Sequence, residues 1–367
     1  MQKLLYKTYN RKKVLITGDT GFKGSWLAIW LKQLGAEVYG YALPPKRKED
    51  NYANCKLQEK IHHLNGDIRD LNKLKNYFED VEPEFAFHLA AQPIVLESYK
   101  NPHYTFETNI MGTVNFFEVV RNTPSVKVAV NITSDKCYKN NECVLGYKEN
   151  DPMGGKDPYS ASKGCSELIT NSYNNSFFNK NLHCSIASAR AGNVIGGGDW
   201  ADYRIIPDFF RAIKKNEKLI IRNPYATRPW QYVLEPLSGY LHLASKLYSD
   251  GNKYSGGWNF GPLGQVNYKV SELIEAIIKY YGKGNVVFDR SSEKLYEANV
   301  LNLDISKAMR FLEWKPVLSF EELVEYTVEG YLVESTESDI YEERVKQIEN
   351  YCLSAKAKIF TFDEVNI

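Results

Sequence analysis

The stretch that decides the fold of this chain runs from Val14 to Leu27 and reads VLITGDTGFKGSWL. An apolar run typical of a buried strand meets three glycines spaced three apart, and apolar residues at helical spacing follow. Glycine permits a tight turn and lets a phosphate approach the backbone, while the N-terminus of the next helix attracts an anion. The pattern predicts a dinucleotide-binding turn. A glycine-rich turn that serves packing alone stays the alternative, because the spacing differs from Gly-x-Gly-x-x-Gly.

The composition is that of a globular protein without a strong overall charge. The 367 residues are 43% hydrophobic and 25% charged, and this length favours two domains or one large α/β unit. Lys and Arg number 46 against 45 Asp and Glu, which leaves a net charge of +1. This balance excludes a protein-wide field that attracts nucleic acid or an anionic membrane, so any phosphate must be recognised by local groups.

The cysteines and the apolar runs bear on the compartment. The six cysteines form no Cys-x-x-Cys pair and have no metal-ligand spacing with the six histidines, so we expect reduced thiols and no metal site. The first residues lack the apolar core of a signal peptide, and no run of 18 apolar residues is present. We therefore expect a cytoplasmic protein with no membrane partner.

Strand-like and helix-like segments alternate through the first half of the chain. Apolar runs of strand type lie at residues 36–43, 63–68, 85–92 and 128–132, and helical spacing lies at residues 69–80 and 103–121. This order predicts an α/β fold with a doubly wound parallel, Rossmann-type sheet. Beyond residue 190 the pattern loosens into short mixed segments, with a strand near 255–260 and a helix at 269–281. We expect a smaller mixed C-terminal substrate lobe there.

These patterns suggest how the chain is divided. We expect residues 11–190 to form the dinucleotide-binding domain, with elements that return to it near residues 233–260. Residues 191–340 would form the substrate lobe, and residues 341–367 a helix and a tail that takes up the final dozen residues. Residues 1–10 are interpreted as a short leader.

The segment after the second expected strand departs from the dinucleotide-binding pattern. A carboxylate about 20 residues after the glycines usually holds the ribose hydroxyls. Pro44, Pro45, Lys46 and Arg47 occupy that place here. A cation there could accept the 2′-phosphate of NADP, whereas a solvated turn would leave NAD as the cofactor.

Tyr159 and Lys163 form a second pattern with chemical meaning. They follow Pro158, which favours the first turn of a helix, and the spacing of four places both side chains on one face. An ammonium close to a phenol favours the phenolate, so we expect Lys163 to lower the pKa of Tyr159. A phenol with a lowered pKa can act as a base near neutral pH.

Together these motifs resemble the extended short-chain dehydrogenase/reductase family over about residues 12–320. The resemblance rests on the glycine loop at 18–24, on Ala90-Ala91 after a strand, and on Asn109, Ser134, Tyr159 and Lys163. Three further stretches are similar to the CDP-glucose 4,6-dehydratase branch of that family. They are SDK at 134–136, GGGDWA at 196–201 and NPYATRPWQ at 223–231.

The resemblance implies a lyase that uses NAD to oxidise carbon 4 of a nucleotide-linked hexose, eliminates water across carbons 5 and 6, and returns the hydride to carbon 6. Tyr159 would take the carbon 4 hydroxyl proton, Ser134 would bind the carbon 4 oxygen, and Asp135, protonated in the complex, would release water from carbon 6. The product would supply 6-deoxy sugars for surface polysaccharide. The implied cofactor-binding residues are Gly18, Thr20, Gly21, Phe22, Lys23, Gly24, Asp67, Ile68, Leu89, Ala90, Ala91, Gln92, Asn109, Tyr159 and Lys163. The implied substrate-binding residues are Asn193, Arg204, Arg228 and Glu297.

Lys136 leaves the base at carbon 5 open. Related enzymes place Glu there, and an ammonium cannot accept a proton. Either Lys136 is neutral and takes the carbon 5 proton, or it stabilises the enolate as a cation while another group removes that proton.

Several alternatives also stay open for the function and the assembly. The substrate could be a dTDP-, GDP- or UDP-linked sugar, the reaction could be a 4-epimerisation, or the fold could serve as a sensor without turnover. The family resemblance implies a homodimer paired through helices at 103–121 and 158–176. Apolar residues there, such as Phe116, Phe117 and Ile169, could equally belong to the subunit core.

Overall fold

The fold is built on one seven-stranded parallel sheet. The computed structural model describes residues 2–142, 145–180, 183–221, 223–264, 267–288 and 301–363. The sheet has the order β11-β6-β5-β4-β1-β2-β3, and all of its pairings are parallel. Its strands are β1 (Lys13–Thr17), β2 (Glu37–Ala42), β3 (His62–Asn65), β4 (Phe85–His88), β5 (Val128–Ile132), β6 (Ser185–Ala191) and β11 (Gly256–Phe260). The predicted α/β fold with a doubly wound parallel sheet is confirmed.

The order of the strands reverses beside β1, which creates the place for a ligand. Thr17 at the end of β1 pairs with Tyr41 of β2 on one side and with His88 of β4 on the other. The loops after β1 and β4 leave toward opposite faces, so a crevice opens at the carboxyl ends of the strands. The glycine loop begins at this crevice.

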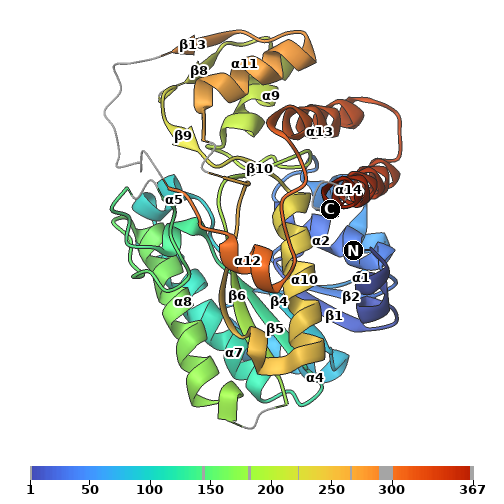
Figure 1. Ribbon diagram of the computed structural model, residues 1–367, viewed down its shortest axis with the longest axis vertical. Helices are drawn as coiled ribbons and strands as arrows, with labels where there is room; N and C mark the ends of the chain where they lie inside the picture. The colour runs from blue at the N-terminus through green and yellow to red at the C-terminus, as the bar shows by residue number, and fades with distance from the viewer. Residues whose placement is uncertain are drawn as a thin grey trace.

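Helices cover both faces of the sheet, as Figure 1 shows. Along β1, Val14 and Ile16 pack into one hydrophobic cluster and Leu15 into another, because successive side chains point to opposite faces. The first face carries α1 (Gln2–Tyr9), α2 (Phe22–Gln33), α10 (Leu234–Asp250) and α14 (Ile340–Asp363). The second carries α4 (Leu71–Val81), α7 (Gly112–Arg121) and α8 (Pro158–Ser176).

A smaller lobe of helices and short strands lies beyond the carboxyl ends of the sheet, at the top of Figure 1. Its strand pairs are β8 with β13, β9 with β12 and β7 with β10. The elements of the lobe are β7 (Val194–Ile195), α9 (Ile205–Lys215), β8 (Leu219–Ile221), β9 (Thr227–Arg228), β10 (Gln231–Tyr232), β12 (Tyr268–Lys269), α11 (Val270–Tyr281), β13 (Val286–Phe288) and α13 (Phe320–Leu332).

Short helices complete the part of the chain that the structure describes. They are α3 (Asn51–Asn54), η1 (Leu57–Glu59), α5 (Val95–Lys100), α6 (Pro102–Phe106), η2 (Glu107–Met111), η3 (Asp135–Cys137), η4 (Phe178–Lys180), η5 (Gly251–Tyr254), α12 (Ser306–Phe311) and η6 (Val333–Ser335). The helix expected at 103–121 is thus three joined pieces, α6, a π-helical turn and α7.

Both chain ends differ from the sequence-based interpretation. The supposed leader is the helix α1, in which Leu5 and Tyr9 are fully buried and the Tyr9 hydroxyl donates to the carbonyl of Leu241. The final dozen residues are not all a tail, because α14 continues to Asp363. A helix as short as α1 is marginal alone and is stabilised by packing, which a local pattern does not reveal.

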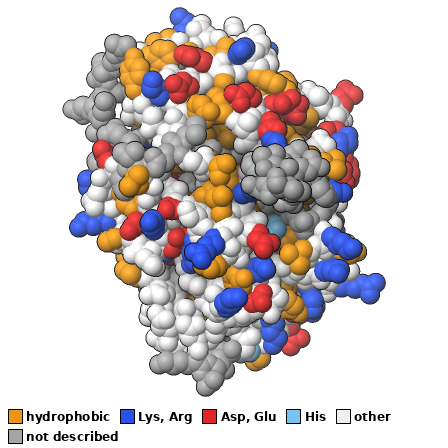
Figure 2. All heavy atoms as spheres, in the orientation of Figure 1, with side chains coloured by type: hydrophobic (Ala, Val, Ile, Leu, Met, Phe, Trp, Pro, Cys, Tyr) orange, Lys and Arg blue, Asp and Glu red, His pale blue; other side chains and the backbone are white. Residues whose placement is uncertain are grey.

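The surface shows charges of both signs. In Figure 2 basic and acidic side chains are interspersed over the visible face, in keeping with the net charge of +1. Among the described helices, none has the length and apolar composition that crossing a bilayer requires.

Candidate functional site

The glycine loop forms a cradle that side chains would fill. Gly18 has a φ of 82°, and a Cβ there would lie 2.6 Å from the backbone nitrogen of Ala90. A Cβ at Gly24 would lie 2.1 Å from the carbonyl oxygen of Gly18. Gly21 is the N-cap of α2, and Phe22 and Lys23 begin that helix. The turn therefore presents bare backbone and a helix N-terminus to the crevice, which fits a pyrophosphate.

Loops from three neighbouring strands line the same crevice. Thr20 donates to the carbonyl of Leu43 after β2, while Asp67 and Ile68 follow β3. The carboxylate of Asp67 pairs with the guanidinium of Arg69, Nη2 to Oδ2 2.7 Å. Leu89, Ala90, Ala91 and Gln92 follow β4.

The side chain of Asn109 connects the loop after β4 to α8 through hydrogen bonds within the protein. Its Oδ1 accepts from the backbone nitrogen of Gln92 at 2.8 Å, and its Nδ2 donates to the carbonyl of Gln92 and to Ser162 Oγ at 2.8 Å. Asn109 is buried in the π-helical turn η2. The structure thus gives it a part in positioning α8 against the loop after β4.

Ser134, Asp135 and Lys136 lie together where β5 ends. Ser134 Oγ donates to Asp135 Oδ1 at 2.8 Å, and Lys136 Nζ lies 3.2 Å from the same oxygen. Asp135 is 1% exposed, yet within the described residues its second oxygen, Oδ2, has no hydrogen-bond partner. A Cβ at Gly192 would lie 3.2 Å from Oδ2, so the glycine leaves room beside it. One carboxylate oxygen is therefore available to a ligand.

Tyr159 and Lys163 lie on the first turns of α8 and are both buried. Burial raises the pKa of the Tyr159 phenol to about 12, although a hydrogen bond with Ser134 and the nearby Arg204 oppose the rise. Burial also lowers the pKa of Lys163 to about 8. The expected lowering of the phenol pKa is therefore wrong for this structure, because the loss of water outweighs the neighbouring groups.

The residues expected to bind a substrate lie on different elements of the smaller lobe and have different hydrogen-bond partners. Asn193 lies between β6 and β7, and its buried Oδ1 has no partner among the described residues. Arg204 caps α9 and pairs with the buried Asp199, Nη1 to Oδ2 2.8 Å. Arg228 lies on β9 and donates to the carbonyl of Thr227. Glu297 lies outside the described residues.

Comparison with known proteins agrees with this arrangement. The family model described as GDP-mannose 4,6 dehydratase matches residues 15–327. A CDP-glucose 4,6-dehydratase of Salmonella typhimurium is 48% identical over 83% of this chain and 86% of that relative. The chain belongs to the nucleotide-sugar 4,6-dehydratase family. The resemblance drawn from the motifs in the sequence is confirmed.

More distant relatives of this dehydratase family span most of the chain. GDP-mannose 4,6 dehydratase 1 of Arabidopsis thaliana is 25% identical over 87% of this chain and 89% of that protein. An epimerase structure from Methanothermobacter thermautotrophicus has a TM-score of 0.79 at 26% identity, covering 91% of this chain and 96% of that one. A dTDP-glucose 4,6-dehydratase structure from Bacillus anthracis, in complex with NAD, has a TM-score of 0.71 at 19% identity, covering 88% and 97%.

A buried ion pair between Glu167 on α8 and Arg190 on β6 of this dehydratase was missed from the sequence. Glu167 accepts from Arg190 Nη2 at 2.7 Å, from Ser188 Oγ at 2.6 Å and from Thr133 Oγ1. Arg190 also donates to the hydroxyl of Tyr138, just beyond η3. The network joins α8 to β6 and to the loop that carries Ser134. Its one sequence signal is spacing, since Glu167 follows Lys163 by four residues on the same helix face.

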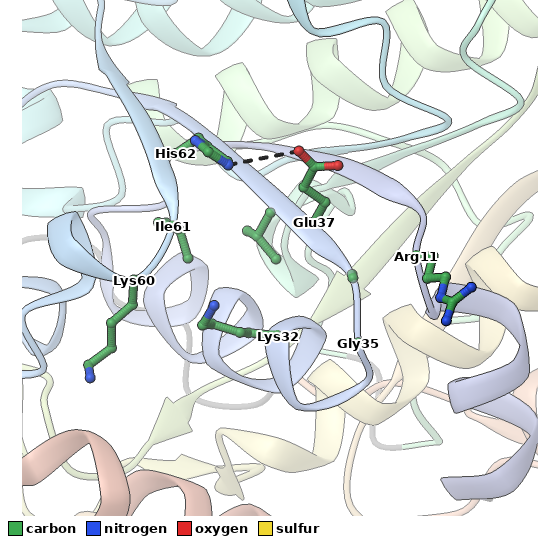
Figure 3. Close-up of a pocket in the computed structure, with 9 residues that line it drawn as sticks. Arg11, Lys32, Gly35, Glu37, Lys60, Ile61 and His62 are labelled. Carbon is green, nitrogen blue, oxygen red and sulfur yellow. Dashed lines mark ion pairs between the residues drawn. The ribbon is translucent and has the colours of Figure 1, made fainter.

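One open surface cavity of this dehydratase lies away from the expected site residues. It holds about 370 Å³ and lies at the amino ends of β2 and β3, the edge of the sheet opposite the glycine loop. Figure 3 shows Glu37 paired with His62, whose Nε2 lies 3.8 Å from Oε1, while Lys60 extends away from that pair. None of the expected site residues lines this cavity, so it takes no part in the proposal below.

Proposed function

We propose that this protein is a CDP-glucose 4,6-dehydratase, which converts CDP-glucose to CDP-4-keto-6-deoxyglucose. The observation that carries the proposal is the contact between Asp135 and Lys136 beside Ser134 at the end of β5. An acid and a possible base there suit an elimination. The 48% identical relative named CDP-glucose 4,6-dehydratase supports the choice of the cytidine-linked sugar.

The glycine cradle fits a nicotinamide dinucleotide, which when bound would supply the acceptor and later the donor of the hydride. Gly18, Gly21 and Gly24 would hold its pyrophosphate, and Asp67 and Ile68 would lie near its adenine. Lys163 would hold its ribose. We propose that residues 11–190, with the returning elements near 233–260, form the domain that binds the cofactor. Residues 191–340 form the lobe that binds the nucleotide sugar, and residues 341–367 form a helix and the chain end.

NAD is the proposed form of the cofactor. Arg47, which could attract a 2′-phosphate, forms an ion pair with Asp202 in the smaller lobe. The backbone nitrogens of Lys46 and Arg47 donate to Asp50 Oδ2, which brings a negative charge to the same turn. Both contacts disfavour a further phosphate at this turn. Titration of NAD and NADP into protein freed of cofactor checks this preference. Tighter binding of NADP would contradict it.

For the first step, the proposed machinery is Tyr159, Ser134 and Lys163. Ser134 would donate to the carbon 4 oxygen, and the Tyr159 phenolate would take the hydroxyl proton. Because the pKa of Tyr159 is raised, its proton must be lost to another group before it can act as a base. Arg204 is the cation whose charge opposes the rise and would stabilise the phenolate.

For the elimination, we propose that Asp135 and Lys136 act as a pair. The 3.2 Å contact allows one proton to pass from the ammonium of Lys136 to the carboxylate of Asp135, which yields an amine and a carboxylic acid. The amine would then take the carbon 5 proton, and the acid would protonate the hydroxyl that leaves carbon 6 as water. The ion pair is thereby restored, so atoms and charge balance. This ordering uses Lys136 as the base.

Asn193, Arg204, Arg228 and Glu297 are the proposed contacts to the nucleotide sugar. Asn193 offers a buried acceptor without a partner among the described residues, which suits a hydroxyl of the ligand. A guanidinium suits diphosphate oxygens, and the charge of Arg204, at the start of α9, acts on both Tyr159 and Lys23.

Incubation with CDP-, dTDP-, GDP- and UDP-glucose in the presence of NAD tests the function. We expect the alkali-induced absorbance of a 4-keto-6-deoxy sugar with CDP-glucose only. Turnover of another nucleotide sugar alone would contradict the proposed substrate. Appearance of CDP-galactose without a keto sugar would establish a 4-epimerase, which the likeness to an epimerase structure makes the second candidate.

We further propose a cytoplasmic homodimer that supplies 6-deoxy sugars for surface polysaccharide. The five described cysteines are free thiols, as in a reducing compartment. Phe116 and Phe117 are fully buried in the subunit, so they cannot form the dimer surface. On α8, however, Leu168 is 58% exposed, which leaves an apolar side chain for a second subunit.

A further inference from the structure

The side chain of Lys23 extends from the glycine loop toward the catalytic residues. Its Nζ donates to the hydroxyl of Tyr240 at 3.3 Å. Tyr240 is fully buried on α10, so the amine of Lys23 lies deep in the crevice. A phenol is a neutral partner and does not compensate an ammonium. A lysine placed in this way is costly to keep charged.

The groups that face Lys23 from the neighbouring elements are mostly cations. They are Lys163 from α8, Arg204 from the start of α9, and Lys136 and Asp135 from η3. The two carboxylates in this cluster are already engaged, Asp199 by Arg204 and Asp135 by Lys136 and Ser134. Within the part of the chain described, Lys23 has no carboxylate partner. The cluster therefore holds more positive than negative groups.

The surroundings lower the pKa of Lys23 to about 7. Burial is the largest cause, and repulsion from Lys163 and Arg204 adds to it, although Asp135 opposes the change. In the free protein much of Lys23 is consequently neutral above pH 7. An anion that enters the crevice would reverse this balance, because charges interact strongly where water is excluded.

We propose that Lys23 takes up a proton when an anionic dinucleotide enters the crevice, so that its ammonium becomes a counter-charge that the free protein largely lacks. The inference rests on the proposed function in one respect, that a dinucleotide binds at the glycine loop. It gives the side chain of Lys23 a specific part in the cofactor binding that the family resemblance implies for this residue. Cofactor binding becomes weaker as the pH rises, since the proton must be supplied by the solvent.

Calorimetric titration of NAD into the cofactor-free protein at pH 8, in buffers of different ionisation enthalpy, counts the protons taken up. A group with a pKa near 7 is about one-tenth protonated at pH 8. Lys23 should therefore contribute about 0.9 proton. Lys23→Arg keeps the positive charge at every pH, so it should bind NAD while taking up about 0.9 proton fewer than the parent protein.

The pH dependence of binding provides the second measurement. Between pH 7.5 and 8.5 the dissociation constant of the parent protein should rise several-fold more than that of Lys23→Arg. Lys23→Met should lose both the proton uptake and much of the affinity at pH 7. Lys346→Met, which removes an exposed lysine on α14, is the matched control and should behave like the parent protein.

Equal proton uptake by the parent protein, Lys23→Arg and Lys23→Met would overturn the proposal. The outcome is separable from the fate of the proposed function, because turnover of CDP-glucose is measured independently of the proton count. A parent protein that binds neither NAD nor NADP would overturn both. Lys163 also has a lowered pKa and repels Lys23, so the comparison is repeated in a Lys163→Arg background, where that side chain stays charged and only Lys23 can take up the proton.

Discussion

Asp135 combines deep burial with one carboxylate oxygen that lacks a partner among the described residues. Oxidation at carbon 4 does not need an acid at carbon 6, whereas elimination does, because hydroxide is a poor leaving group. Asp135→Asn should therefore still give the absorbance of reduced nicotinamide with CDP-glucose but about 100-fold less keto product. Rapid-mixing absorbance combined with product analysis reads the two steps separately.

The control for this variant is Asp250→Asn, which alters an exposed carboxylate at the end of α10 and should leave both steps unchanged. Tyr159→Phe should instead abolish both steps, because the first proton cannot be removed. Product formation by Asp135→Asn within about threefold of the parent protein, a barrier change under ~1 kcal/mol, would mean that Asp135 is not the acid.

Glu167 is a second buried residue, and its charge should contribute to the stability of the fold. Burial acts to raise its pKa, but Arg190 and hydrogen bonds from Ser188 and Thr133 outweigh burial and lower it. Because the pKa of Glu167 is lower in the folded protein than in the unfolded chain, where it is near 4.5, its charge stabilises the fold above about pH 4.5. This stabilisation is lost as the pH falls through the pKa of the folded protein. Glu167→Gln should lower the free energy of unfolding by about 3 kcal/mol at pH 7, since it leaves the buried Arg190 uncompensated.

Urea denaturation measures this loss of unfolding free energy. Repeating the measurement at several pH values distinguishes the loss of the carboxylate charge from a change in side-chain packing. As the pH falls below about 4.5, the difference between Glu167→Gln and the parent protein should shrink, because the carboxylate of the unfolded parent protein then takes up a proton. The double variant Glu167→Leu/Arg190→Met removes both charges and should recover part of the stability. A difference that stays constant from pH 7 to pH 3 would contradict an electrostatic origin.

Among the elements, α1 shows how packing creates a helix from a segment with little signal of its own. Leu5 is fully buried against the core, whereas its neighbour Leu4 is 48% exposed. Leu5→Ala should cost about 2–4 kcal/mol of unfolding free energy, while Leu4→Ala should cost under about 0.5 kcal/mol. Denaturation of the two variants side by side tests the docking of α1. Equal costs would contradict it.

The C-terminal helix α14 is anchored by a buried charge in addition to its apolar contacts with the core. Arg344 is fully buried and forms an ion pair with Glu334. It also donates to Asn51 Oδ1 at 2.9 Å and to the carbonyl of Gly330 at 2.8 Å. The backbone nitrogen of Asn51 in turn donates to the carbonyl of Gly198, in the glycine-rich turn of the smaller lobe, at 3.2 Å. The helix thereby ties the sheet to that lobe.

At the scale of the whole molecule, the exposed Leu168 on α8 is the basis for the expected dimer. Light scattering should give about 84 kDa, twice the 42.1 kDa of the chain. Leu168→Arg should shift the mass toward the monomer, because a charge would be buried in the interface. Leu353→Arg changes a similarly exposed residue, 64% against 58%, on α14 and should leave the mass unchanged. A parent protein with a mass near 42 kDa would exclude the dimer.

The sequence by itself determined the features that depend on near neighbours along the chain. The glycine loop, the alternation of strands and helices, and the spacing of Tyr159 and Lys163 all follow from short-range geometry: the φ that only glycine takes freely, the periods of strand and helix, and the turn of an α-helix. These features were enough to predict the sheet, while the family was predicted from the resemblance of further motifs, such as SDK at 134–136 and GGGDWA at 196–201. They did not reveal α1, since its stability comes from contacts with α10.

Only the tertiary structure decided which charges meet and how far water is excluded from them. The contact of Lys23 with Tyr240 joins residues 217 positions apart, and that of Arg344 with Asn51 joins residues 293 apart. Such pairs depend on strand order and on how the lobes pack, which no local pattern encodes. The expected lowering of the Tyr159 pKa failed for the same reason, because burial is a property of the assembled fold and here outweighs the neighbouring side chains.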